Sequence, residues 1–564
     1  MGRVGRPKRQ SSRQTGVGKS PAVTKRFEQV LGGIIRLMKI GHLDHRMDEM
    51  VNDLVNMLEE SESEIQAWDE ALYYQGLCVI SEYHSYLGHY EKSLNAVARG
   101  DLVYRELQES MGRPAPTENE NKMLLREKVR YVADYAMAKY YRSHEYDEAR
   151  KIVNFCVGLA HDKLRDKNEF PAAGTLAQLM YFLGRINRQD HNHQEAMGNF
   201  DEAVNYFYER GEQKKNQYLD NAERQIEELN FIRHRTANCL ALGLGWICYT
   251  RGQLRQALHF ILPARALLLH TEDPINVAYT NLIYGTTRRA LGRTDEETIS
   301  LIAGACNTFK KMRHKSYMAR ATYELALAYF YIGDQRKAES ALAEIDGLLA
   351  ERPDSRWDCN ALIIRSRIER EMNKNYVAAE KRASTAYDRA DAKHLILCKI
   401  DALIARGEAR ISRREFKMAR KDLEEALDLN QTSNSGRKDE GASPKIEAVC
   451  HLHMARSFAL EGEGSQAREH FQKWEALRVE VEHSFIHKLA VSVDKEISSL
   501  EEGFFIPPDT MDLNYGKWRE KLQIFLVNQA KFRKQEKEQQ RELLGVARPT
   551  FLKWEKIGKK RKLP

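Results

Sequence analysis

The chain has 564 residues, of which 42% are hydrophobic and 30% charged, and its formal net charge is +8. This length is too great for one ordinary hydrophobic core, unless the chain is a repeat array that grows in one dimension. No run of about 18 uncharged apolar residues is present, which argues against a membrane-spanning helix. The basic N-terminus also lacks the apolar stretch of a secretory signal.

The positive charge lies at the two ends of the sequence. Residues 1–26 hold eight Lys and Arg and no acid, and residues 514–564 hold fifteen Lys and Arg against five acids. The residues between hold 66 basic and 76 acidic side chains, a net charge of −10. This distribution favours a polyanion that the ends contact. The alternative is that the basic ends only solubilise or target the chain.

Residues 1–26 have no periodic apolar pattern, and we expect a disordered basic arm. Within it "GRPKR" resembles the core of an AT-hook, in which a Gly-Arg-Pro stretch lies in a narrow minor groove. Val4 stands where the usual arginine precedes that glycine. The resemblance implies possible DNA contacts from three residues of the arm, Arg6, Lys8 and Arg9. The later "TGVGKS" lacks the first glycine of a nucleotide-binding loop, so we expect no phosphate site there.

Residues 27–502 repeat a unit of an alanine-rich helix, a turn and a second helix. Examples are "LGHYEKSL", "RGQLRQALHF", "IGDQRKAESAL" and "RREFKMARKDL". One anchor position per unit is Ser93, Ala149, Ala203, Ala257, Glu297, Ala338, Ala379, Ala419 and Ala467. The intervals between anchors are 56, 54, 54, 40, 41, 41, 40 and 48 residues, so four consecutive intervals agree within one residue. The spacing predicts an array of helix pairs.

This unit resembles the tetratricopeptide repeat (TPR), in a variant with longer helices than the usual period of about 34 residues allows. Long-helix variants of this kind occur in bacterial regulators that resemble the maltose activator. The resemblance implies an all-α fold, a right-handed superhelical solenoid of helix pairs with a protein or peptide ligand in its concave groove. A degenerate first pair is expected around Gly41 and Leu43. Glycine would end each first helix in a left-handed turn, and small residues would allow close helix crossings.

No catalytic or metal-binding motif stands out in the array. Two groups of potential ligands lack a partner at zinc-like spacing: Asp190, His191, His193 and Glu195, and Cys450, His451 and His453. The eight cysteines are scattered without C-x-x-C pairs, which favours buried free thiols in a reducing cytosol. We therefore expect a non-enzymatic protein with no cofactor and no metal.

Two prolines in "EEGFFIPPDTMDLNYG" predict a linker over residues 503–516, followed by a separate unit over residues 517–564. In this unit Lys537–Leu544 is predicted to be helical, and Gly545 supplies a helix stop. Pro549 stands where the first turn of a second helix tolerates proline. A short helix, a glycine turn and a basic second helix form the helix-turn-helix arrangement.

The string "LLGVARPTFLKWEKIG" resembles the helix-turn-helix of Fis-type regulators, which also lies at the end of the chain. MerR- and excisionase-like domains show a similar continuation, which Thr550, Trp554 and Gly558 match, whereas Glu555 departs from the usual apolar residue. The resemblance implies a set of DNA-contacting residues: Arg548, Thr550, Lys553, Lys556, Lys559 and Lys560. The alternatives are a helix that caps the solenoid, and binding of RNA or another polyanion.

The leading hypothesis from sequence is a DNA-binding transcription regulator built on a TPR scaffold. The array would bind a protein or peptide, the C-terminal unit would bind DNA with further contacts from the arm, and no membrane would be involved. It would be cytoplasmic and associated with the nucleoid, or nuclear in a eukaryote. The alternative is a non-enzymatic adaptor for protein–protein interaction with basic targeting tails.

Overall fold

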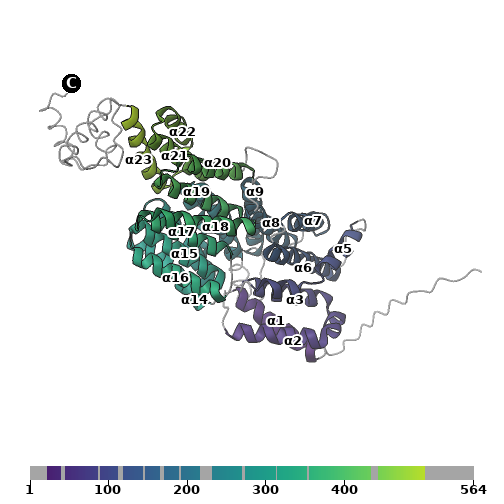
Figure 1. Cartoon of the computed structure of the whole chain (residues 1–564). Coiled ribbons are helices and arrows are strands. Elements are labelled where there is room, and N and C mark those ends of the chain that lie inside the picture. Colours follow the sequence, from purple (N-terminus) through teal and green to yellow (C-terminus); the bar gives the residue numbers. More distant parts are fainter. Residues whose placement is uncertain are drawn as a thin grey trace, which may run out of the picture. The chain divides into compact units, whose positions relative to one another are not determined.

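The computed structural model describes the helical array and the short turns within it. The described residues are 22–39, 45–86, 89–111, 119–143, 146–164, 171–189, 192–215, 232–269, 273–312, 314–351, 355–432 and 442–501. Every regular element in these ranges is a helix and none is a strand (Figure 1). The expected all-α class is therefore confirmed.

The helices follow one another with short connections. Their bounds are α1 Ala22–Lys39, α2 His45–Trp68, α3 Glu70–Tyr86, α4 Tyr90–Ala96, α5 Gly100–Glu109, α6 Asn119–Ser143, α7 Tyr146–Lys163, α8 Pro171–Gln189, α9 His193–Lys215, the π-helix η1 Cys239–Gly245, α11 Trp246–Arg251, α12 Leu254–Leu268, α13 Pro274–Ala290, α14 Glu296–Lys311, α15 Lys315–Ile332, α16 Gln335–Glu351, α17 Ser355–Glu371, α18 Tyr376–Ala392, α19 Ile396–Ser412, α20 Phe416–Thr432, α21 Pro444–Glu461, α22 Gly464–Leu477 and α23 Ser484–Glu501. Residues 232–238, directly before η1, are also α-helical.

The helices are stacked in pairs. Each helix packs against the next one in the chain, as α15 does against α16, and α17 against α18 (Figure 1). In addition, the first helices of neighbouring pairs contact each other: α13 touches α15, α15 touches α17, and α17 touches α19. Contacts mainly between neighbouring repeats are typical of a solenoid, and here α11 and α21 also contact each other. The described part of the chain is a TPR-like helical array.

Glycine ends several first helices as the repeat pattern predicts. The backbone is left-handed, with φ between 84° and 91°, at three of these glycines: Gly252, Gly333 and Gly462. After α15 the N–H of Asp334 donates to the carbonyl of Tyr329 at 3.0 Å, a bond that satisfies one of the free carbonyls at the helix end. Two repeats put Lys374 and Arg414 in the same left-handed region instead.

The anchor positions lie at close helix crossings, with one correction. Eight of the nine are at most 2% exposed: Ser93, Ala149, Ala203, Ala257, Ala338, Ala379, Ala419 and Ala467. Glu297 is exposed instead, and its neighbour Thr298 is fully buried. The prediction was wrong by one residue because the turn before α14 is longer. In that turn the carboxylate of Asp295 caps the helix by accepting from the N–H of Thr298 at 2.9 Å.

The first helix pair is present, but it begins earlier than predicted. α1 begins at Ala22, so residues 22–26 belong to a helix and not to the expected arm. Thr24 and Phe27 are fully buried, because apolar and small residues three to four positions apart share one helical face. The rest of the arm, and the turn expected around Gly41 and Leu43, lie outside the described residues.

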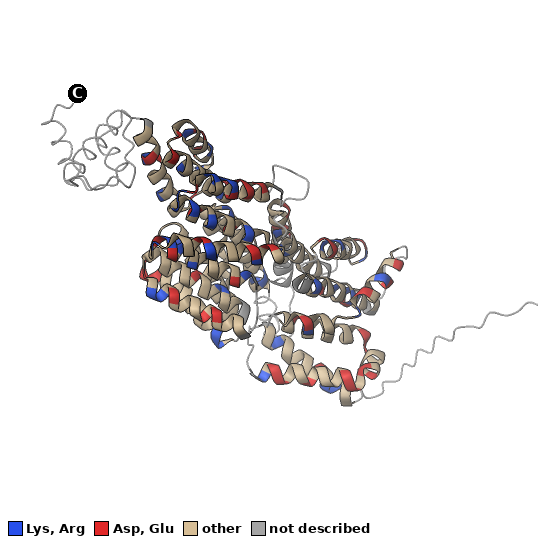
Figure 2. Cartoon of the chain, viewed as in Figure 1, with Lys and Arg blue, Asp and Glu red and all other residues tan. Residues whose placement is uncertain are grey.

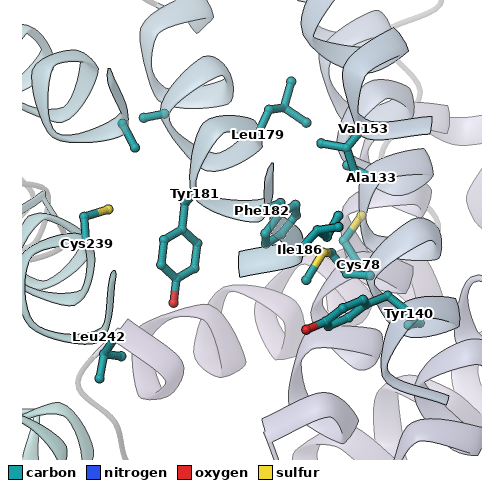
Figure 3. Packing of buried hydrophobic residues seen from close by; sticks show 14 of the residues in the cluster. Cys78, Ala133, Tyr140, Val153, Leu179, Tyr181, Phe182, Ile186, Cys239 and Leu242 are labelled. Atoms are coloured by element: carbon teal, nitrogen blue, oxygen red, sulfur yellow. The ribbon is translucent and has the colours of Figure 1, made fainter. Parts of the chain in front are cut away.

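The core between α3 and η1 is packed closely enough to require glycine. The ring of Phe200 lies between Gly184 and Gly243, where an added Cβ would come within 2.8 Å and 2.6 Å of ring carbons. Figure 3 shows the surrounding side chains, with Cys78 and Ile186 on one side of Phe182, and Tyr181 pointing between Cys239 and Leu242. Since no Cβ fits at these crossings, this core fixes how α8 and η1 approach each other.

Charge of both signs is interspersed along the helices (Figure 2). All eight cysteines are free and buried, as the sequence predicts. In the described ranges no helix is long and apolar enough to cross a membrane.

Candidate functional site: a charged and aromatic cluster on the first helices

The first helices of the array carry charged and aromatic residues on one face. On α15 the residues Arg320, Glu324 and Tyr331 follow at intervals of four and seven, which places them on one side of a helix. Similar residues come from α11, α13, α17, α19, α21 and the turn before α23. We call the following residues the central cluster: Tyr249, Arg289, Arg320, Tyr323, Glu324, Tyr331, Arg367, Asp401, Lys445 and His483.

Arg289 is the most buried cation of the central cluster. Its side chain is 1% exposed, and its Nη2 donates to Glu324 Oε2 at 2.7 Å and to the Tyr249 hydroxyl at 3.2 Å. The guanidinium carbon also lies 5.4 Å from the centre of the Tyr331 ring. Burial alone would lower the pKa of Arg289, but Tyr249 and Glu324 raise it above its usual value. The Arg289 guanidinium therefore stays charged, and its hydrogen bonds join α11, α13 and α15.

A second ion-pair group adjoins the central cluster at Glu408. This carboxylate is 7% exposed and lies 2.9 Å from Arg370 Nη2, 3.6 Å from Arg367 Nε and 3.1 Å from His453 Nε2. Burial opposes its ionisation, but Arg370 and Arg367 lower the pKa of Glu408 below its usual value. One carboxylate thus holds α17, α19 and α21 together.

Two other members of the central cluster have pKa values shifted towards their neutral forms. Asp401 is exposed, yet desolvation by the surrounding protein raises its pKa. Burial lowers the pKa of Lys445, which is half-buried and near Asp401, Arg289 and Glu324. Asp401 therefore lies at the boundary between protein and solvent, close enough to Arg367 and Lys445 for their positive charges to act on it.

Arg320 differs from Arg289 and Arg367 because it has no carboxylate within ion-pair distance among the described residues. Its guanidinium carbon lies 3.8 Å from the centre of the Trp246 ring and 4.9 Å from the centre of the Tyr279 ring. Its Nη2 is buried and has no hydrogen-bond partner among the described residues. Burial, and then the charges of Arg188 and Arg356, lower the pKa of Arg320 to about 9, so the group remains protonated at neutral pH.

Residues 481–485, which we call the strap, cross the ends of several first helices. The backbone N–H of Glu482 donates to the carbonyl of Gly252 at 2.9 Å. A Cβ at Gly292 would lie 2.6 Å from the hydroxyl of Ser484, so this turn also approaches the strap closely. The Phe485 ring stacks on Tyr331 with ring centres 3.7 Å apart. The strap thus joins the turns after α11 and α13 to the end of α15.

The strap and α21 bring distant parts of the sequence together. The Ser443 hydroxyl donates to the carbonyl of Thr250 at 3.3 Å, across 193 residues of sequence. His483, only 6% exposed, lies within the electrostatic range of Lys445 and Arg289. The central cluster is therefore assembled by repeats that are not neighbours in the chain.

A separate polar group lies in the N-terminal repeats. Glu82 of α3 pairs with Arg235 at 2.9 Å and with Arg130 of α6 at 3.3 Å. Burial raises the pKa of the nearby Asp134 to about 7. This group ties helix 232–238 and α6 to α3.

The DNA-binding residues predicted from sequence lie outside the described residues. This holds for Arg548, Thr550, Lys553, Lys556, Lys559 and Lys560, for Arg6, Lys8 and Arg9 of the arm, and for the linker at residues 503–516. Contacts divide the chain into two units between Ile497 and Ser498, close to the expected end of the array. The placement of these residues remains a prediction.

The two groups of potential metal ligands are not brought together as sites in the described ranges, where no group of three such residues could hold a metal ion. Cys450 is buried in a hydrophobic cluster, His451 contacts His470 with nitrogens 3.3 Å apart, and His453 pairs with Glu408. The three side chains therefore point in different directions. His193 is buried and Glu195 exposed, while Asp190 and His191 lie outside the described residues.

Sequence patterns do not predict the central cluster, because charges spread along helix faces are typical of the surfaces of repeat proteins. The available signal was their place on first helices, at positions such as Arg320, Tyr323 and Glu324 in "RATYELALAYFY", among otherwise apolar residues. Charged side chains on a helix face that the repeat buries are costly unless paired or used.

The chain is similar to several solved structures at low sequence identity. No protein-family model matches the chain, and a search of curated protein sequences finds no match. Among solved structures, a Rap protein complexed with competence and sporulation factor is 12% identical, with a TM-score of 0.45, and covers 73% of this chain and 100% of its own. A human IFIT1 dimer with m7Gppp-AAAA is 14% identical, with a TM-score of 0.35 and coverage of 80% and 95%. A signal transduction ATPase with a tetratricopeptide repeat sensor from Pyrococcus horikoshii is 12% identical, with a TM-score of 0.31 and coverage of 77% and 74%.

Proposed function

We propose that this protein is a non-enzymatic scaffold that binds a protein or peptide partner at the central cluster. The support comes from the free energy that it costs to bury the charges of the central cluster. Buried ion pairs seldom stabilise a fold more than apolar packing of the same volume would, so a solenoid does not need them for stability alone. Aromatic rings and charges of both signs are the groups that hold and orient a peptide.

The observation that carries this proposal is that charged and aromatic side chains of the central cluster reach the surface of the first helices. Asp401 on α19 is exposed, so a partner can reach its carboxylate. Tyr323 on α15 and Arg367 on α17 are partly exposed in the same cluster, so an aromatic and a cationic contact accompany the carboxylate.

The test is binding of the full chain to an array of synthetic peptides of varied charge and apolar content. Replacing Tyr323 with Ala should weaken the selected peptides by about tenfold, or ~1.4 kcal/mol. The control is Val377→Ala, a 64% exposed residue on the second helix α18, which should leave binding unchanged. If no peptide binds, or if both variants lose binding equally, the central cluster is not the partner site.

We further propose that residues 517–564 bind DNA and make the scaffold a transcription regulator, nucleoid-associated in a bacterium or nuclear in a eukaryote. The support is the sequence alone: the helix-turn-helix resemblance of "LLGVARPTFLKWEKIG" and the +10 charge of residues 514–564. Arg548 and Thr550 would read bases, and Lys553, Lys556, Lys559 and Lys560 would contact phosphates, with Arg6, Lys8 and Arg9 as further contacts.

Duplex DNA titrations at several salt concentrations test this second proposal. The full chain should bind with an affinity that falls steeply with salt, by a logarithmic slope of about 0.9 per phosphate contact. A chain that ends at residue 513 should lose this binding, while its helical content and its peptide binding persist. DNA binding that survives the truncation would contradict the assignment of this binding to residues 517–564. If the parent chain does not bind DNA at all, only the adaptor function remains.

A further inference from the structure

We propose that Arg320 is the residue that receives a carboxylate of the bound peptide, with Trp246 and Tyr279 as the walls of that subsite. This inference rests on the proposed peptide-binding function and specifies the class of ligand, an acidic peptide. It depends on three observations about Arg320: the aromatic rings that contact its guanidinium, the missing hydrogen-bond partner of its Nη2, and the charged side chains near it.

The two aromatic rings cover the guanidinium of Arg320. The guanidinium carbon is 3.8 Å from the centre of the Trp246 ring and 4.9 Å from the centre of the Tyr279 ring. A guanidinium that is stacked in this way is held in orientation and keeps its N–H edge free to donate. The π-helix η1 ends directly before Trp246, and such segments occur frequently at functional sites.

The N–H edge of Arg320 has an unused donor. Its Nη2 is buried without a hydrogen-bond partner in the described part of the chain. Glu324 is four residues further along α15, but it pairs with Arg289 at 2.7 Å. By contrast, Arg370 on α17 has a carboxylate within 2.9 Å and Arg406 on α19 has one within 2.8 Å.

Positive charge also gathers around Arg320. Arg188 and Arg356 lie near enough for their charges to act on it, and the carboxylate with the largest effect on it, Glu324, already pairs with Arg289. An excess of positive charge in a partly desolvated position favours an anion. A planar carboxylate matches the N–H edge of a guanidinium with two parallel hydrogen bonds. A nucleobase fits less well, because the guanidinium already occupies the ring faces on which a base would stack.

The binding test compares two matched peptide pools. One pool carries a single glutamate among apolar and aromatic residues, and the other carries glutamine at the same position; all peptides have blocked ends. The parent chain should bind the glutamate pool at least tenfold more tightly, measured by fluorescence anisotropy. Arg320→Gln should remove this preference, and Arg320→Lys should retain part of it. The control Arg382→Gln, on the second helix α18, should keep the full preference.

A stability measurement separates a binding role from a structural one. Without ligand, an unpaired and partly desolvated guanidinium contributes little to folding, so Arg320→Met should unfold at the same or a higher temperature than the parent. The matched variant Arg289→Met leaves Glu324 buried without its partner and should unfold at a clearly lower temperature. A large loss of thermal stability in Arg320→Met would assign Arg320 to the packing of the array and overturn the inference.

The remaining outcomes distinguish the ligand sources. If both pools bind equally and Arg320→Gln changes nothing, the peptide-binding function stands and the carboxylate subsite falls. If neither pool binds but inorganic phosphate does, in a manner that depends on Arg320, the site takes a free oxyanion and the acidic-peptide inference is wrong. If nothing binds, the proposed function falls together with the inference.

Discussion

Ala338 lies at one of the closest helix crossings in the array and is fully buried between α15 and α16. Ala338→Phe adds a ring where the core leaves no space, so we expect the free energy of unfolding to fall by about 1–3 kcal/mol. Chemical denaturation measures this loss. Ala343→Phe is the control, because Ala343 on the same helix is exposed and the added ring would meet solvent. Equal stability of Ala338→Phe and the parent would contradict the assigned crossing.

Glu408 concentrates more positive partners than any other single carboxylate discussed above. Glu408→Gln should lower the free energy of unfolding by about 3–5 kcal/mol, since it takes the buried carboxylate away from Arg367 and leaves Arg370 with only the half-exposed Glu371. Glu371→Gln is the matched control: Glu371 also pairs with Arg370 but is half-exposed, and we expect a change of less than about 1 kcal/mol. Urea unfolding of the two variants would show whether burial makes the difference.

The same residue predicts a dependence on pH. Since the folded state lowers the pKa of Glu408, its stabilising contribution is complete above the usual carboxyl value of 4.5 and is lost as the pH falls towards the folded value. The parent should therefore lose stability on acidification below about pH 4.5, and Glu408→Gln should lose less over the same range. Thermal unfolding across this range tests the sign. A variant as acid-sensitive as the parent would show that other groups dominate.

At the scale of the elements, two turns that follow first helices allow the effect of backbone strain on stability to be told apart from the effect of contact with the strap. Gly292 and Gly333 share a left-handed backbone, with φ of 88° and 84°. An added Cβ at Gly333 meets nothing within 4 Å, whereas at Gly292 it would lie 2.6 Å from the Ser484 hydroxyl. Gly333→Ala should cost about 1 kcal/mol, the penalty of a left-handed alanine. Gly292→Ala should cost more, because the strap must also shift.

A double variant isolates the contact with the strap. Adding Ser484→Ala to Gly292→Ala removes the nearest atom, so it should recover part of the extra loss in denaturation experiments. Added to Gly333→Ala, the same Ser484→Ala substitution should recover nothing. Recovery of stability in both backgrounds, or in neither, would mean that contact with the strap does not cause the extra loss of stability in Gly292→Ala.

These turns also explain what local sequence could predict. The unit of small residue, turn and helix is set by residues close in the chain, so the helix pairs and eight of nine anchors were predictable from spacing. The prediction at Glu297 was wrong because the turn that contains Asp295 has one residue more than the turns at the same place in other repeats. Glycine was not needed in every turn, since Lys374 and Arg414 adopt the left-handed backbone themselves.

The central cluster could not be predicted in the same way. Its members lie on α11, α13, α15, α17, α19 and α21, and the contact between Ser443 and Thr250 spans 193 residues. Period and composition describe each helix face but not which distant helices meet. The π-helix η1, which sets the position of Trp246, likewise has no recognised signal in "CLALGLG".

At the scale of the whole array, most contacts join neighbouring repeats, and the strap is an exception. A solenoid with only neighbouring contacts can lose its end repeats one after another, because its stability is a sum of local terms. The strap adds direct contacts between the last repeats and the turns after α11 and α13. It therefore couples the opening of α21–α23 to that of α11–α15, and it keeps the central cluster assembled.

Phe485→Ala tests this coupling, because its ring stacks on Tyr331 with centres 3.7 Å apart. In the parent, amide hydrogen exchange should report similar opening free energies for α15 and α21. In Phe485→Ala the amides of α21–α23 should exchange faster, while those of α15 change little. Trp357→Ala is the control: Trp357 contacts Tyr323 of the neighbouring repeat, with ring centres 5.8 Å apart. It should destabilise its own repeats without separating α15 from α21. If Phe485→Ala instead leaves the two regions opening together, the strap does not couple them, and the contacts between neighbouring repeats and between α11 and α21 hold the central cluster in place.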